Sequence, residues 1–252
     1  MNRPSMHSPS RTGPPLDAGL ALCRPRLPPR AVAYVAHLLV GQPIQLRVTR
    51  PRRTKLGDHR PPGRGVTFHR ITVNDDLNPY AFLTTLLHEI AHATSWQRHR
   101  LLGRRLAPHG REWKQEFGSI LQPVVDEGIV PVTVKHALAR YLLNPSARSC
   151  TDRGLVLALA EFDAPDATRI RVEDLAEETV FRADNGSLFR AGRMVRSRRQ
   201  CFGIPSGSEY RVHGLVLVEP VRLAVGRAGD QDGRRQGGSG GSGRRARKSI
   251  VE

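Results

Sequence analysis

Residues 78–96 read NPYAFLTTLLHEIAHATSW, and this stretch decides the fold of the chain. Asn78 is a residue type that caps helix N-termini, and Pro79 suits the first helical position. A helix is therefore predicted from Asn78 to about Trp96. Apolar residues cover most of its circumference, so we expect this helix to be buried at the centre of a domain. They are Phe82, Leu83, Leu86, Leu87, Ile90 and Ala91.

The same helix carries the pattern H-E-x-x-H, at His88, Glu89 and His92. Residues four apart lie on one face of a helix, so the two imidazoles can bind a single ion. Glu89 then projects toward a water molecule on that ion and can act as the general base of peptide hydrolysis. We expect one Zn²⁺ per chain, because zinc is commonly bound by histidine in such sites.

A catalytic zinc site needs a third protein ligand, because the fourth position is kept for water. We predict His109, since the proline and glycine that flank it place it at the start of a helix that can pack across the first. Glu112, one turn further, is the alternative ligand or a partner that orients an imidazole. His99 and His136 are less favoured by position. Two metal-free histidines are the simpler alternative, but a buried Glu89 is costly without a cation.

The apolar periods on either side of this helix predict an α+β domain over residues 29–147, with a small sheet and several helices. Helices are expected over residues 29–40, 113–121 and 131–143, and strands over residues 43–49 and 67–73. Residues 50–65 are expected to form a basic loop that contains prolines and glycines.

After residue 152 the apolar period changes from helical to alternating, which is typical of short strands. An Asn185-Gly186 turn should join two of them as a hairpin. We expect a small all-β module of the SH3-like barrel type over residues 152–224, with a two-sheet arrangement as the alternative. The expected strands are residues 155–162, 179–183, 187–191, 194–202 and 210–218.

Both ends of the chain are expected to be disordered. Residues 1–28 are rich in proline and arginine and lack the apolar segment of a secretory signal, so we expect a disordered leader. Residues 226–252 contain the run GGSGGSG followed by basic residues, which predicts a flexible basic tail. The longest apolar stretch, residues 31–40, is about half of what a membrane helix requires, so no membrane span is expected.

The three cysteines, Cys23, Cys150 and Cys201, are far apart and odd in number. Neither a disulfide framework nor a four-cysteine zinc ribbon can be built from them. We therefore expect a reducing compartment, the cytoplasm, and interpret the cysteines as small buried or half-exposed residues.

The chain carries 40 Lys and Arg against 23 Asp and Glu, a formal net charge of +17. Such an excess attracts polyanions, so we expect DNA, bound through sequence-independent phosphate contacts, as a partner besides a protein or peptide substrate. A solvated arginine-rich surface without such a partner is the alternative. The residues predicted to contact phosphates are Arg50, Arg52, Arg53, Lys55, Arg104, Arg105, Arg111, Arg196, Arg198 and Arg199.

Four blocks of the chain resemble the SprT-like (Spartan-type) metallopeptidase family in order and approximate spacing. They are RTKLG at 53–57, HRITVN at 69–74, LNPY at 77–80 with LLHEIAHA at 86–93, and HGREW at 109–113. The resemblance covers about residues 29–145 and implies a zincin-like domain with zinc ligands His88, His92 and His109 and catalytic Glu89. Many members continue with a four-cysteine zinc ribbon, which this chain lacks.

The resemblance further implies a substrate, because a eukaryotic member of the family cleaves proteins that are crosslinked to DNA. We therefore expect a zinc-dependent endoprotease that acts on nucleic-acid-associated proteins, including crosslinked ones, by attack of metal-activated water. A basic nucleic-acid-binding protein with a structural, non-catalytic zinc is the first alternative. A zinc peptidase without a role in nucleic-acid metabolism is the second.

Overall fold

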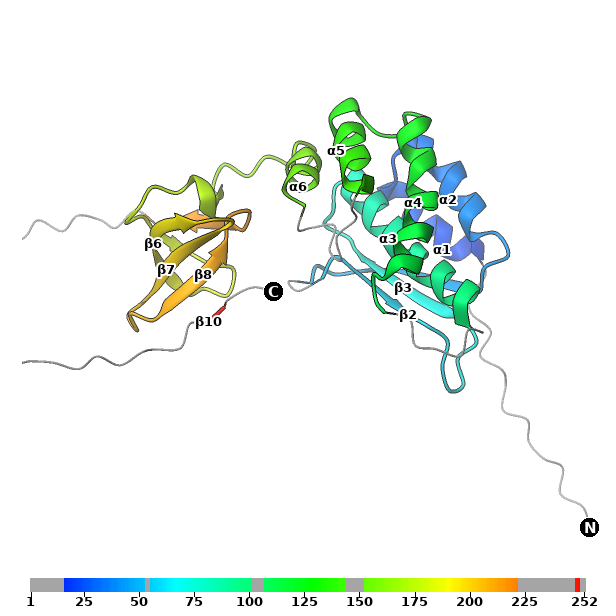
Figure 1. The fold of residues 1–252 in the computed structure, drawn as a ribbon, viewed down its shortest axis with the longest axis horizontal. Helices are drawn as coiled ribbons and strands as arrows, with labels where there is room; N and C mark the ends of the chain where they lie inside the picture. The colour runs from blue at the N-terminus through cyan, green and yellow to red at the C-terminus, as the bar shows by residue number, and fades with distance from the viewer. Residues whose placement is uncertain (1–15, 53–54, 101–106, 144–151, 222–247, 250–252) are drawn as a thin grey trace, which may run out of the picture. The chain divides into compact units, whose positions relative to one another are not determined.

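The computed structural model describes residues 16–52, 55–100, 107–143, 152–221 and 248–249. The chain divides into two compact units, Met1–Ala164 and Pro165–Glu252. The described residues form six α-helices and two sheets, which confirms the predicted α+β class (Figure 1). None of the helices in these ranges is long and apolar enough to cross a membrane.

The first unit contains a three-stranded sheet in the order β1-β3-β2. Strand β1 (Ile44–Thr49) runs parallel to the central strand β3 (His69–Asn74), and β2 (Gly57–Arg60) pairs antiparallel with the other side of β3. Strands β1 and β3 confirm the two predicted strands. Strand β2 lies within the predicted loop, because its sequence Gly-Asp-His-Arg has no apolar alternation that would indicate a strand.

Helix α3 (Pro79–His99) is the predicted central helix. Its N-terminus is capped as expected, because the Asn78 side chain accepts hydrogen bonds from the backbone N–H groups of Tyr80 and Ala81, both at 3.0 Å. Residues 82–91 of this helix are buried without interruption, as the apolar residues around its circumference predict. The helix contacts strands β2 and β3 of the sheet as well as helix α4.

Three further helices confirm predicted ones: α2 (Val32–Leu39), α4 (Arg111–Asp126) and α5 (Val132–Leu143). Helices α3 and α4 pack against each other, and α5 packs against α4. This packing fixes the N-terminus of α4 beside α3. The core that holds these elements together includes Val35, Leu39, Ile71, Leu86, Phe117, Leu121 and Leu138.

Residues 155–162 were predicted as a strand, and this prediction is wrong. They lie largely in helix α6 (Arg153–Ala160), whose N-cap Asp152 accepts a hydrogen bond from the Leu155 N–H at 2.8 Å. Leu155 and Ala158, three residues apart, are buried in the core of the first unit. A short apolar run fits a buried strand as well as a helix, and here the packing decides. The first unit therefore extends to Ala164, beyond the predicted limit of residue 147.

Part of the expected disordered leader, residues 1–28, is folded, and residues 1–15 lie outside the described residues. Helix α1 (Leu16–Cys23) and a 3-10 turn over Arg24–Arg26 fold within that range. Cys23 and Leu27 are buried in the core of the first unit, and α1 packs against β1. Prolines on both sides of α1 hid this helix from sequence analysis, while burial of Cys23 and packing of Leu20 against the core stabilise it.

The second unit is a single sheet in the order β10-β8-β7-β6-β5-β9-β4. The predicted Asn185-Gly186 hairpin is present, with Gly186 at φ 81°. Within the described residues the sheet does not close, so the predicted SH3-like barrel is wrong in this respect. The strands are β4 (Ile170–Arg171), β5 (Val180–Arg182), β6 (Leu188–Val195), β7 (Arg198–Ile204), β8 (Glu209–His213), β9 (Leu217–Pro220) and β10 (Lys248–Ser249).

Strand β10 falls within the expected disordered tail of residues 226–252, and it pairs in parallel with β8. The core of this unit is small and aromatic at its centre, where the rings of Phe181 and Phe189 stack at 5.6 Å. Cys201 is fully buried in the same core, as expected for a cysteine without a ligand role.

Candidate metal centre

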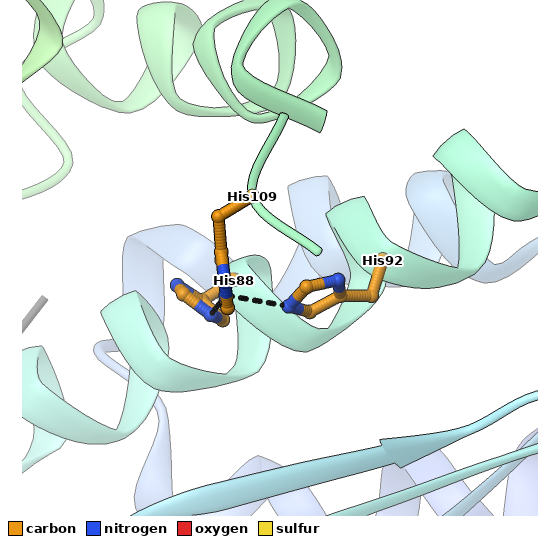
Figure 2. Close-up of side chains that lie close together, drawn as sticks. All are labelled: His88, His92 and His109. Atoms are coloured by element: carbon orange, nitrogen blue, oxygen red, sulfur yellow. Dashed lines mark hydrogen bonds between the residues drawn. The ribbon is translucent and has the colours of Figure 1, made fainter. Parts of the chain in front are cut away.

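Three histidine side chains converge at the junction of helices α3 and α4. His88 and His92 project from one face of α3, one turn apart, and His109 reaches them from the turn just before α4 (Figure 2). The Nε2 atom of His109 lies 3.1 Å from that of His88 and 3.0 Å from that of His92. The structure thus brings together the three residues that the sequence predicted, and their ligand atoms all lie within 4.8 Å of one another.

The arrangement of these nitrogens suits a shared cation. A single imidazole nitrogen carries either one proton or one lone pair, so Nε2 of His109 cannot make two good hydrogen bonds at once. Three imidazoles around a tetrahedral zinc, with Zn–N distances of about 2.0–2.1 Å, place their nitrogens about 3.4 Å apart. The observed separations of 3.0 and 3.1 Å are close to that value. The triad could therefore hold a divalent metal ion.

His109 has a backbone conformation that residues other than glycine rarely adopt. Its φ is 59°, in the left-handed region, and the Gly110 N–H donates to the carbonyl oxygen of Ala107 to close the turn. Such strain persists only where surrounding contacts hold it, and it concentrates at functional sites. This turn aims the imidazole of His109 at α3.

Trp113 is a site residue to which sequence reasoning assigned no role. Its ring centroid lies 4.7 Å from those of His88 and His109 and 5.3 Å from that of His92. The indole is 2% exposed, so it forms a rigid apolar wall against all three imidazoles. Its position four residues after His109, on the apolar face of α4, was the available signal.

The side chain of Glu89, the residue that follows His88 on α3, is buried. Burial, reinforced by the nearby Asp58 carboxylate, raises the pKa of Glu89 to about 8 against the lowering influence of Arg52 and Lys55. A carboxyl group with this pKa exchanges a proton near neutral pH, as a general acid and base must. A neighbouring divalent cation would favour its ionised form.

Strand β2 lies directly against this carboxyl group. A Cβ atom added at Gly57 would lie 2.5 Å from Oε1 and 2.8 Å from Cγ of Glu89, and 2.8 Å from Cγ2 of Thr85. Such distances are shorter than van der Waals contact, so only glycine leaves room for Glu89 here. Strand β2, which was not predicted from the sequence, thus forms one wall of the candidate site.

A second pair of histidines, from the sheet, adjoins the triad. Nε2 of His59 on β2 lies 2.8 Å from Nδ1 of His69 on β3, and the ring of His59 is parallel to that of His92 at 5.8 Å. His69 is fully buried. Sequence reasoning missed both residues, because their proximity depends on the pairing of β2 with β3.

The buried titratable groups predict how the stability of the metal-free protein depends on pH. Burial lowers the pKa of His59 and His69 to about 4, of His88 to about 3 and of His92 to about 2. Unfolded histidines titrate near 6.5, so below this pH the unfolded chain binds more protons and the free energy of unfolding falls. Folded Glu89 instead keeps its proton up to about pH 8, whereas its ordinary value is 4.5. Stability therefore also falls as the pH rises toward 8.

From pH 4.5 to about pH 7 the four histidines outweigh the single glutamate, so we expect maximal stability of the metal-free protein near pH 7. Urea unfolding in the presence of a chelator, repeated from pH 4.5 to 8.5, measures this profile. The Glu89→Gln variant should lose the decline on the alkaline side and keep the decline on the acid side. A free energy of unfolding that does not change with pH in either protein would contradict the burial of these histidines and of Glu89.

The predicted phosphate-contacting residues of the first unit differ in their surroundings. Arg50 and Arg111 are exposed. Lys55 is also exposed and forms an ion pair with Asp58 at 2.7 Å. Arg52 is half-buried and donates hydrogen bonds to Asn74 Oδ1, Thr72 Oγ1 and the Leu56 carbonyl oxygen, so it stabilises the sheet. The remaining three, Arg53, Arg104 and Arg105, lie outside the described residues.

Of the three arginines of the second unit that were predicted to contact phosphates, not all lie at the surface. Arg196 is exposed and Arg198 is half-buried. Arg199 is 4% exposed, and its guanidinium donates to the backbone carbonyl oxygens of Gly192, Glu173 and Leu175. Arg199 is therefore a structural residue of this unit and not a surface group for phosphates.

The other histidines and acids considered as ligands are not part of the triad. Within the described residues, His88, His92 and His109 are the only group of three or more potential ligands close enough to share one ion. Glu112, His99 and His136 are not part of that group, and Cys150 lies outside the described residues. The chain matches no family model, no curated protein and no solved structure.

Proposed function

We propose that this protein is a zinc-dependent endoprotease of the SprT-like class, with a zincin-like first unit. The observation that supports the proposal is the convergence of three imidazole nitrogens beside a buried glutamate whose pKa is raised to about 8. Three histidines are a ligand set typical of catalytic zinc, and a retained glutamate between them distinguishes a hydrolytic site from a purely structural one.

In this proposal His88, His92 and His109 hold the cation. Bound there, a divalent cation polarises a peptide carbonyl group and lowers the pKa of a water molecule. The Glu89 carboxylate accepts a proton from the attacking water and then donates it to the leaving amine. Trp113 keeps the imidazoles in place, and Gly57 leaves room for the carboxyl group. The two described cysteines are buried and unpaired, which suits a cytoplasmic location.

We further propose that the substrates are proteins associated with nucleic acid, including proteins crosslinked to DNA. The support is the net charge of +17 and the exposed basic residues of the first unit, which include Arg50 and Arg111. Arg111 is the first residue of α4, two positions after the metal ligand His109. A phosphate backbone held there would bring an attached protein close to the metal centre.

Cleavage of a chemically unfolded protein by the purified chain tests this function. We expect cleavage that stops on chelation, returns with Zn²⁺ and is faster when DNA is present. The stimulation by DNA should weaken as salt rises, because phosphate contacts release counterions. Metal and DNA binding without any cleavage would identify a binding protein with a structural zinc. A cleavage rate that does not change when DNA is added would identify a zinc peptidase without a nucleic-acid role.

The Gly57→Ala variant should retain its metal but lose activity by about ten- to hundredfold, because the added methyl group displaces the Glu89 carboxyl group. The measurement is kcat/KM together with metal content and melting temperature. Gly63→Ala is the matched control, since nothing lies within 4 Å of a Cβ atom at that position. Equal losses in the two variants would show that Gly57 has no specific relation to Glu89.

A further inference from the structure

Strand β2 turns one of its faces toward helix α3. Residues two apart on a strand lie on the same face, and Gly57 and His59 are such a pair. A Cβ atom at Gly57 would lie 2.5 Å from Oε1 of Glu89, and the ring of His59 is parallel to that of His92 at 5.8 Å. His59 therefore lies beside a metal ligand, on the strand face that contacts the glutamate. The function proposed above leaves His59 without a role.

Contacts with buried residues hold the imidazole of His59 in place. Its Nε2 atom lies 2.8 Å from Nδ1 of His69, and the two rings stack with their centroids 5.1 Å apart. His69 is fully buried, and its ring packs edge-to-face against that of Trp96 at 5.0 Å. A group that is fixed by enclosed neighbours keeps its orientation before and during a reaction. The His59 ring is thus preorganised.

The other ring nitrogen of His59, Nδ1, is open to a ligand. The one hydrogen bond of this side chain within the described residues is the contact between its Nε2 atom and His69. Several polar atoms in the same part of the chain are buried without a partner, but Nδ1 of His59 is not among them. The side chain is half-buried. A substrate atom can therefore reach this nitrogen.

The pairing with His69 indicates which nitrogen of His59 carries the proton. One of the two facing nitrogens donates and the other accepts, so only one of them carries a hydrogen. Nε2 of His69 is buried without a partner, and a buried N–H group without a partner is rarer than an unpaired acceptor. This favours a His69 that is protonated on Nδ1 and donates to Nε2 of His59. His59 then carries its own proton on Nδ1, as an accessible N–H donor.

We propose that His59 is a further catalytic residue, which donates a hydrogen bond from Nδ1 to the carbonyl oxygen of the scissile peptide bond. The inference rests on the proposed peptide hydrolysis. As the water oxygen bonds to the carbonyl carbon, the C=O electron pair moves onto the oxygen and a water proton moves to Glu89. As the C–N bond breaks, the pair re-forms C=O and Glu89 protonates the amine. The His59 proton stays on Nδ1 throughout.

Such a donor acts mainly on the transition state. The carbonyl oxygen gains its negative charge only as the water attacks, and a donor that is already oriented needs no rearrangement at that moment. Loss of one donor of this kind lowers kcat by about 10²–10³-fold. KM should change little, because the uncharged substrate gains less from the same hydrogen bond. His69 is a positioning residue in this scheme, since it acts through His59.

Two substitutions of His59 separate the donor from the contact with His69. The amide nitrogen of asparagine takes the place of Nδ1, so His59→Asn keeps the donor and loses the contact. The amide of glutamine reaches the place of Nε2, so His59→Gln keeps the contact and loses the donor. We expect His59→Gln to lower kcat about a hundredfold and His59→Asn to lower it less than about tenfold. A purely structural role of the ring predicts the reverse order.

The measurement is kcat and KM for an unfolded protein, together with metal content and melting temperature. His136→Gln is the matched control, because His136 is an exposed histidine on α5 outside the triad. It should keep the wild-type values. An unchanged kcat in His59→Gln, or a larger loss in His59→Asn, would overturn this inference and leave the proposed function intact. A wild type that cleaves nothing would refute both.

A phosphinic peptide provides a second readout, because its tetrahedral phosphorus carries oxygens where the charged carbonyl oxygen develops. Its affinity for metal-loaded His59→Gln should fall by the same factor as kcat/KM, since transition-state analogues lose the interactions that the transition state loses. The affinity of a product peptide should not change. Equal affinities of wild type and His59→Gln for the phosphinic peptide would contradict a hydrogen bond to the developing oxyanion.

Discussion

The Glu89→Gln variant is expected to cleave an unfolded protein about a thousandfold more slowly than the wild type while it binds the same amount of metal. Glutamine has nearly the same size and is neutral, so it preserves the packing around this buried position. Its amide cannot accept a proton from water, and the loss of a general base typically lowers the rate by about 10²–10⁴-fold. Single-turnover cleavage and metal analysis of the same preparation give both quantities.

Glu116→Gln is the matched control for this variant. Glu116 is also a buried glutamate, 3% exposed, but it accepts a hydrogen bond from Arg98 at 2.8 Å and is not part of the metal centre. Its substitution should lower the stability of the fold through the broken ion pair and leave the metal-dependent cleavage in place. Undiminished cleavage by the Glu89→Gln variant would contradict the catalytic role of Glu89, whatever the control does.

The second large effect is expected from His109→Asn, which should lose stoichiometric metal and, with it, all activity. Asparagine tolerates the left-handed backbone of this position better than most residues, so the turn before α4 is kept. Two imidazoles then remain on α3. We expect the affinity for Zn²⁺ to fall more than about a hundredfold, since even the loss of an outer partner of a ligand weakens binding ten- to hundredfold.

Competition titration with a chromophoric chelator measures this affinity, and His136→Asn is its control. His136 is exposed on α5 and does not belong to the triad, so its substitution should leave the affinity unchanged. Glu112→Gln extends the comparison to the alternative ligand that the sequence suggested. If Glu112→Gln abolished metal binding and His109→Asn did not, the third ligand would be the carboxylate.

The sequence predicted the part of the site that depends on local structure. Asn78 and Pro79 fix the start of α3, and the four-residue spacing of His88 and His92 fixes their common face, so neither depends on the rest of the fold. The choice of His109 needed one further step, the packing of α4 on α3, which the apolar face of α4 made predictable.

The residues that sequence reasoning missed depend on contacts between distant segments. Gly57 and His59 belong to β2, a polar strand that exists only through its pairing with β3. From the sequence, Arg199 was predicted to be a surface cation within a basic run. In the folded sheet, however, its guanidinium donates to three backbone carbonyl groups. Helix α6 resembles a strand until packing against α5 selects the helix. Tertiary contacts override local propensity in each case.

The central claim is that three imidazoles hold one zinc ion, and X-ray absorption at the zinc edge of the purified, reconstituted protein tests it most directly. The account predicts one zinc per chain with three histidine nitrogens at about 2.0–2.1 Å and one further oxygen ligand. The His109→Asn variant, saturated with zinc, should show one histidine fewer. A sulfur ligand in the first coordination shell, fewer than three histidines in the wild type, or the absence of stoichiometric zinc would contradict the account.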